Sequence, residues 1–154
     1  MRSRRHITIG WVVFVATAVA ASFGARAYEP AMNYTLQCMG CHTPDGAGVP
    51  DRVPSIRTTL LPFARMPEGR QFLVQVPGSA QSTLSNAELA TLLNWMIDNL
   101  SEERGDYQRF TEEEVARYRP HALVGVRATR ERLLASQPSA AQAGTSAQSS
   151  SRAQ

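Results

Sequence analysis

The stretch Cys38-Met39-Gly40-Cys41-His42 is the most informative part of this 154-residue chain. Its spacing is C-x-x-C-H, the pattern typical of covalent haem attachment. Two thiols three positions apart on a helical turn project toward one side, where both can add to the vinyl groups of one haem. The imidazole of the next residue can then bind the iron. We therefore expect Cys38 and Cys41 to hold one haem c by thioethers, with His42 as an axial iron ligand.

Other uses of a cysteine pair fit the sequence less well. A structural zinc site commonly needs four ligands, and the chain has only these two cysteines. A thioredoxin-type pair needs a βαβ setting, which the sequence does not indicate. A disulfide across two intervening residues is strained and would leave His42 unexplained. The sequence therefore favours a haem site.

The first 27 residues have the pattern of an export signal. Three arginines precede an apolar run of 17 residues at 7–23, and the small-x-small sequence Ala25-Arg26-Ala27 follows. We expect residues 1–27 to be a signal peptide that is cleaved after Ala27, which predicts a periplasmic protein. The alternative is an uncleaved anchor, because such a run lies at the lower edge of what spans a bilayer. A membrane partner is expected only in that case.

The charge of the chain divides between this leader and the rest. The whole sequence has 16 basic and 13 acidic residues and a pI near 9.3. Four of the arginines lie in the leader, so the remainder carries 12 basic and 13 acidic residues and a net charge of −1. The basic pI belongs to the leader, and no nucleic-acid partner is expected. The chain has no lysine, so a lysine ring for docking is excluded.

After the leader, the periodicity is that of an all-α protein. We expect a short helix over 30–38, turns over 43–49, irregular extended chain around 53–62 and a short helix around 71–75. Ser85 and Glu88 form a capping box before an apolar stripe with helical spacing. The members of the stripe are Leu89, Leu92, Leu93, Met96, Ile97 and Leu100.

Two more helices are expected near the carboxyl end. A second capping box, Thr111 with Glu114, opens a helix that Pro120 ends, and another helix follows over 126–135. Residues 137–154 are mostly Ser, Ala, Gln and Gly, which predicts a disordered tail.

Over residues 33–100 the chain resembles the class I c-type cytochromes. In that family the first helix ends in C-x-x-C-H and carries an aromatic residue one turn before the first cysteine, where this chain has Tyr34. A glycine-rich loop follows, like residues 45–48 here. A proline twelve residues after the histidine, as Pro54 is here, lends its carbonyl to the imidazole. The last helix crosses the first and offers an aromatic residue, which Trp95 matches.

The resemblance implies a small class I cytochrome c fold wrapped round one covalent haem. The cytochrome domain would span residues 28–101, and residues 102–136 would form a C-terminal helical extension. Cys38, Cys41, His42 and Pro54 would then make up the haem-binding set.

The second axial ligand is where the chain departs from the family. The family usually has Met followed by Pro several residues before the last helix, and Val76 stands at that place. Met66, followed by Pro67, is the distal candidate, although it precedes the short helix that the ligand loop normally follows. Met96 is interpreted as core filler and His121 as an exposed histidine. An open or water-filled sixth position is the further alternative.

These features predict a periplasmic electron carrier rather than an enzyme. Its partners would be redox proteins, with a dehydrogenase or respiratory complex as donor and an oxidase or another carrier as acceptor. An open iron would instead indicate a haem enzyme or a gas-binding protein. A third alternative is an electron-transfer subunit of a larger complex, attached through residues 101–135. The acidic residues at 102–114 and the arginines at 117–132 form either a docking face or an ordinary ion-paired surface.

Overall fold

The structure is a computed structural model and describes residues 28–137. Within that range helices are the only regular secondary structure besides one isolated antiparallel bridge between Val49 and Val53, so the all-α prediction is confirmed there. The predicted signal peptide and the tail from residue 138 onward lie outside the described residues. The helices are α2 (Pro30–Gln37), α3 (Met39–His42), α4 (Leu60–Ala64), α5 (Pro67–Gln75), α6 (Pro77–Ala80), α7 (Asn86–Leu100), α8 (Glu112–Tyr118) and α9 (Val126–Ser136).

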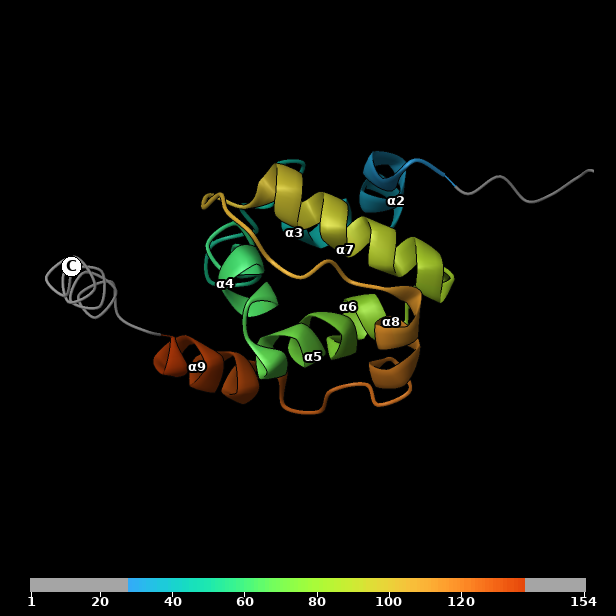
Figure 1. The fold of residues 1–154 in the computed structure, drawn as a ribbon. Coiled ribbons are helices and arrows are strands. Elements are labelled where there is room, and N and C mark those ends of the chain that lie inside the picture. Colours follow the sequence, from blue (N-terminus) through green and yellow to red (C-terminus); the bar gives the residue numbers. More distant parts are fainter. Residues whose placement is uncertain (1–27, 138–154) are drawn as a thin grey trace, which may run out of the picture.

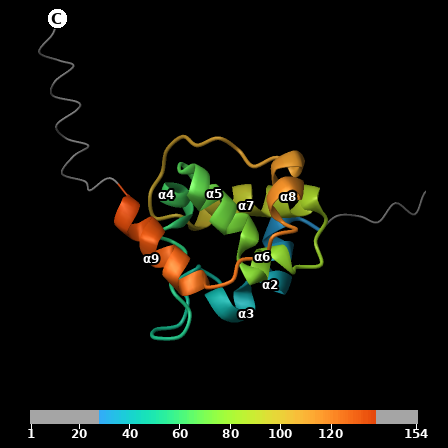
Figure 2. The same ribbon diagram turned by 90° about the horizontal axis from the view of Figure 1, so that it is seen from below.

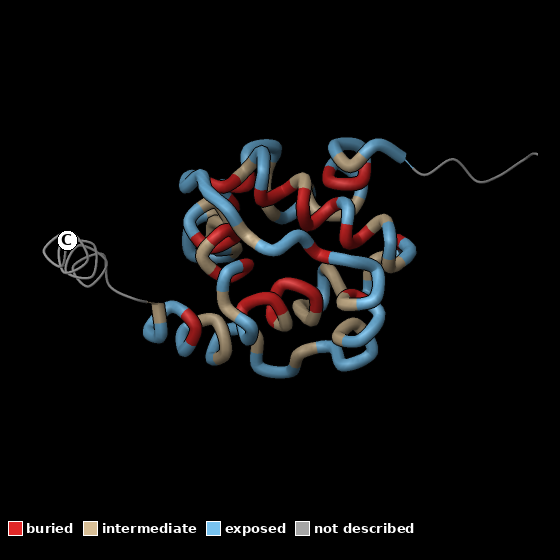
Figure 3. The backbone as a smooth tube through the Cα atoms, viewed as in Figure 1, coloured by how far each residue is buried: buried red, intermediate tan, exposed pale blue. Residues whose placement is uncertain are grey.

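The helices form two levels around one hydrophobic core. The long helix α7 lies beside α2 on one level, and α5, α6 and α8 lie on the other (Figure 1). Viewed from below, α9 runs along one side of the molecule next to the loop that follows α3 (Figure 2). The buried backbone positions gather on the facing sides of α7 and α5 (Figure 3). This core holds α2 and α7 together, and α2 leads directly into the C-x-x-C-H residues.

The predicted capping box and apolar stripe of α7 are both confirmed. The Ser85 hydroxyl accepts from the Glu88 N–H at 3.2 Å, and the Glu88 carboxylate accepts from the Ser85 N–H at 2.8 Å. All members of the stripe are buried except Leu100, which is half-buried at the end of the helix. Met96 belongs to this core, which confirms its interpretation as core filler.

The expectation of extended chain up to residue 62 is wrong, because a short helix begins at Leu60. Pro62 does not prevent this helix, since it lies in the first turn, where its missing N–H is not needed. The other four residues of α4 are buried, and this burial drives its formation. The next helix also begins earlier than predicted, at Pro67, another proline in a first turn.

The segment after α5 differs from the prediction in a second way. α5 ends at Gln75 as expected, but Pro77 and Gly78 then open the additional turn α6. Pro77 is the first residue of that turn, where its fixed φ suits a helix. The connection to α7 is therefore partly helical.

The last two helices lie where the sequence predicts them. Thr111 caps α8 by accepting from the Glu114 N–H at 3.3 Å. The reciprocal half of the predicted capping box is not seen, because the Glu114 carboxylate binds the Arg70 guanidinium instead. α9 extends one residue past the predicted end, to Ser136.

The segment beyond residue 101 is packed into the same core as the helices before it. Phe110, Val115 and Leu133 are buried with the residues of α5 and α7. The Asn94 side chain exchanges two hydrogen bonds with the backbone of Phe110, at 3.0 and 2.9 Å. The hydrophobic core is therefore continuous across the predicted boundary at residue 101.

Among the described residues, no helix combines the length and the apolar character that crossing a bilayer requires.

Candidate haem-attachment site

The C-x-x-C-H residues lie at a break between two helices. Cys38 directly follows α2, and its N–H donates to the Tyr34 carbonyl at 2.9 Å. The Cys38 carbonyl accepts from the N–H groups of Cys41 and His42 at 3.1 and 3.0 Å, which closes the single turn α3. The predicted helix over 30–38 is confirmed except for this last residue, and the motif occupies a turn of its own.

The two thiols are accessible and are not joined in a disulfide. Cys38 is half-buried and Cys41 is exposed. Burial raises the pKa of the Cys38 thiol to about 11, and the neighbouring Cys41 adds to the shift. A thiol with a raised pKa stays protonated at neutral pH, whereas redox-active C-x-x-C pairs depend on a lowered thiol pKa. The environment of Cys38 therefore disfavours a thioredoxin-type use of the pair.

His42 presents a neutral imidazole. Burial lowers its pKa, and the nearby carbonyl of Pro54 opposes part of that shift. Nδ1 of His42 is buried, and the contact with Pro54 falls short of hydrogen-bond geometry, so Nδ1 has no partner. A small movement that completed this bond would fix the tautomer with a proton on Nδ1 and leave Nε2 for a metal.

The loop after His42 brings Pro54 back to it. The N–H of Gly48 donates to the His42 carbonyl at 3.1 Å, which turns the chain back toward α3. Val49 and Val53 then exchange two backbone hydrogen bonds at 2.9 and 2.8 Å, which place Pro54 beside the turn. The predicted turn chemistry of this segment is confirmed, and it explains how a residue twelve positions away reaches the imidazole.

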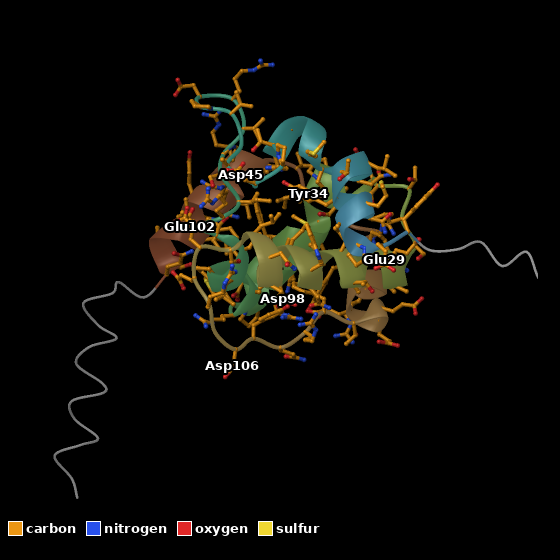
Figure 4. The ribbon with its side chains drawn as sticks, turned by 90° about the horizontal axis from the view of Figure 1, so that it is seen from above. Glu29, Tyr34, Asp45, Asp98, Glu102 and Asp106 are labelled. Atoms are coloured by element: carbon orange, nitrogen blue, oxygen red, sulfur yellow. The ribbon has the colours of Figure 1, made fainter. Side chains whose placement is uncertain are left out.

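Tyr34 joins α2, α7 and the loop. Its hydroxyl donates to the Thr43 carbonyl at 2.6 Å, and its ring lies 5.7 Å from the Trp95 ring between centroids. Figure 4 shows Tyr34 on α2 next to α7 and Asp45 on the loop farther along the same face. The two aromatic residues singled out in the sequence are thus brought together. Ala31 and Thr35, which lie on the same helix as Tyr34, are exposed.

The ionisation of Tyr34 predicts a loss of stability at high pH. The pKa of Tyr34 is raised to about 12, mainly by burial and further by Cys38 and Asp45. Because this folded-state pKa lies above the ordinary value of 10.0, the contribution of Tyr34 is complete below pH 10 and is lost as the pH rises through 12. We expect Tyr34→Phe to lose about 1 kcal/mol of stability at pH 7 with its hydrogen bond, and to show a shallower decline above pH 10.

Urea unfolding at a series of pH values measures this effect, with Tyr28→Phe as the matched control on an exposed tyrosine. The pKa of Tyr107 is also raised to about 12, so its ionisation still lowers the stability of both variants above pH 10. Parallel pH curves for wild type and Tyr34→Phe would contradict the prediction.

The chemistry of these residues fits a covalent haem. The set offers two free thiols three positions apart and a neutral imidazole with an unpartnered Nδ1. Pro54 also lines a cavity of about 560 Å³ between the loop and α9. Cys38, Cys41 and His42 do not line this cavity, so it is separate from the α2–α3 turn that carries them.

The candidates for a second iron ligand lie in different surroundings. Met66 precedes α5 and is half-buried against the hydrophobic core. Val76, at the position of the family's usual Met, is also half-buried against the core. His121 is exposed, in agreement with its interpretation. The sequence-predicted Met66 therefore has its side chain engaged in packing.

Much of the acidic cluster is paired with arginines of the preceding helical region. Glu102 lies 3.3 Å from Arg57, which also contacts Asp45 at 3.3 Å, and Glu103 lies 3.7 Å from Arg65. These pairs are mostly exposed, so each is worth little stability. For Glu102 and Glu103, the ion-paired surface describes the structure better than a free acidic face.

No known protein family matches the chain, and no curated protein is significantly similar to it.

Two residues near the site were not singled out from the sequence. The Gln37 side chain, directly before Cys38, donates to the Thr83 hydroxyl at 3.1 Å. Arg119 donates to backbone carbonyls of the segment between α6 and α7. Neither contact has a local sequence pattern, because each joins residues more than thirty positions apart.

Proposed function

We propose that the protein is an exported electron carrier with one haem c attached to Cys38 and Cys41. The observation that carries this proposal is the α2–α3 turn, where two free thiols and a neutral imidazole follow one another. Bound there, the haem would supply one-electron exchange at its iron. His42 would ligate the iron, and the Pro54 carbonyl would hold its Nδ1 proton.

The protein's own residues define how such a carrier would work. Cys41 is exposed, so one edge of the attached group would lie near the surface, where a redox partner can approach. Tyr34 and Trp95 fix the attachment turn against α7, which limits rearrangement of the site during electron exchange. The partners would be a donor dehydrogenase or respiratory complex and an acceptor oxidase or carrier, in contacts that are weak and short-lived.

A second candidate function is ligand binding at an open iron, in a haem enzyme or gas-binding protein. Val76 at the usual Met position favours it, as does the packing of Met66 against the core. Against an enzyme stands the exposure of His121, the one distal acid–base candidate of the sequence.

Covalent haem retention tests the proposal directly. The full precursor is expressed in a bacterium that matures c-type cytochromes, and the purified protein is examined by haem staining after denaturing electrophoresis and by intact mass. We expect one covalent haem in wild type and in the control His121→Ala. We expect none in the double variant Cys38→Ala/Cys41→Ala. Wild type with two free thiols, in a host that loads another C-x-x-C-H protein, would overturn the proposal.

The same preparation separates the two candidate functions. A reduced spectrum that does not respond to carbon monoxide supports the carrier, because all six iron positions are then filled. A prompt shift with carbon monoxide supports the open-iron alternative.

A further inference from the structure

The segment between α5 and α7 is fastened by the part of the chain beyond residue 111. Gln75, at the end of α5, accepts from the N–H of Leu123 at 2.8 Å, and its side chain donates to the Tyr118 carbonyl at 3.4 Å. α6 and α8 lie side by side in both ribbon views (Figures 1 and 2). The connection between α5 and α7 is therefore hydrogen-bonded at its start to the end of α8 and to a residue that follows it.

Arg119 holds the rest of this connection. Its Nε donates to the Ala80 carbonyl at 3.1 Å, its Nη1 to the Leu84 carbonyl at 2.6 Å, and its Nη2 to the Ser82 carbonyl. Nη1 also donates to the Asn86 side chain at 3.1 Å, so the hydrogen bonds of Arg119 extend to the first turn of α7. The planar guanidinium suits such a set, because its donors have fixed directions.

The same loop contacts the haem-attachment turn on its other side. Thr83, between two of the carbonyls held by Arg119, accepts from the Gln37 amide at 3.1 Å. Gln37 is the residue directly before Cys38. The loop 80–86 is thus hydrogen-bonded to Arg119 and also to the end of α2, next to the α2–α3 turn.

We propose that Arg119 is a positioning residue that holds the loop 80–86 beside the haem-attachment turn and so limits the access of small ligands to the iron. The inference rests on the proposed function, since it needs a haem at Cys38 and Cys41. It gives the segment beyond residue 101 a role at the site, although none of its residues belongs to the C-x-x-C-H set.

The test uses the haem-loaded full protein and two measurements. Binding of imidazole to the ferric protein is followed by absorption, and deuterium exchange of the amides of residues 79–86 is followed by mass spectrometry. Arg119→Ala is compared with Arg119→Lys, which keeps the charge without the planar fork. The matched control is Arg117→Ala, an exposed arginine two residues away.

We expect Arg119→Ala to bind imidazole about tenfold more tightly and to exchange the loop amides about tenfold faster, because several charge-assisted hydrogen bonds are lost. Arg119→Lys should be intermediate and Arg117→Ala should match wild type. Faster exchange with imidazole affinity unchanged would show a purely structural role and overturn the inference while leaving the haem proposal intact. Unchanged exchange would also overturn it. Absence of covalent haem in wild type would overturn both. If Arg119→Ala does not accumulate, Arg119→Lys against wild type decides.

Discussion

Gly48→Ala should lower the free energy of unfolding by about 3 kcal/mol or more, which is a large fraction of the stability of a small domain. An alanine Cβ at this position would lie 2.3 Å from the Val53 carbonyl oxygen and 2.9 Å from the carbonyl of Pro54. These neighbours are backbone atoms, so they cannot rotate away as a side chain would. The φ of Gly48 is +76°, a region that costs any other residue further energy.

Substitutions of two other glycines separate the cost of the positive φ from the cost of the close backbone contact. Gly125 also has a positive φ, of +78°, but nothing lies within 4 Å of an added Cβ, so Gly125→Ala measures the cost of the backbone conformation alone. Gly78→Ala has open space and no positive φ. We expect a cost of about 1 kcal/mol for Gly125→Ala and little change for Gly78→Ala. Urea unfolding of the three variants gives the order, and equal losses at Gly48 and Gly125 would contradict the close approach of Gly48 to Val53.

The same substitution also affects the orientation of His42. Because the added Cβ would meet the carbonyls of both Val53 and Pro54, a Gly48→Ala protein that does fold must have shifted this part of the loop, the Pro54 carbonyl included. The imidazole of His42 would then lose its nearest acceptor, which connects the glycine-rich loop to the orientation of the proposed iron ligand.

Local features of the chain could be predicted from its sequence because their partners lie a few residues away. The capping box of Ser85 and Glu88 and the apolar stripe that follows both depend on contacts within one helix. The C-x-x-C-H turn is local in the same sense. Pro54 is separated from His42 by twelve residues, and its place beside the imidazole was expected from the resemblance rather than from periodicity.

The errors arose where a local rule has a non-local exception. The sequence predicts extended chain at Leu61-Pro62, yet Pro62 falls in the first turn of a helix whose other residues are buried by tertiary packing. Glu114 was assigned to a capping box, yet its carboxylate binds Arg70, 44 positions earlier. Arg119 could not be singled out, because three of its partners are backbone carbonyl oxygens, which leave no trace in the sequence.

Glu114→Ala should cost about 3 kcal/mol of stability, because it leaves a buried guanidinium without its counter-ion. The Arg70 side chain is 9% exposed and that of Glu114 is 17% exposed. Nε of Arg70 donates to Glu114 at 2.6 Å, and a second bond from Nη2 makes the pair bidentate. Arg70 also donates to the Ala64 carbonyl at 3.0 Å and lies 4.0 Å above the Phe110 ring.

The matched control is Glu103→Ala, which removes an acid from the pair with Arg65. There the side chains are 42% and 58% exposed, so we expect a change below about 1 kcal/mol. The double variant Arg70→Met/Glu114→Leu should lose less stability than the sum of the losses in Arg70→Met and Glu114→Leu, because neither charge is then left unpaired. A loss at Glu114 no larger than that at Glu103 would contradict the buried pair.

The number of transitions in the urea unfolding curve of Glu114→Ala shows whether the segment beyond residue 101 folds together with the rest. Arg70 lies on α5 and Glu114 on α8, so their pair joins the helices before residue 101 to the segment after it. Since Phe110 and Val115 are also in the core, breaking the pair should weaken both parts together in one cooperative transition. An attachment arm that folds independently would instead give Glu114→Ala an early transition of its own, while the transition of the α7 core stayed at its wild-type urea concentration. A single shifted transition would make residues 102–136 part of the folded unit, which is what Arg119 requires if it is to hold the loop beside Cys38.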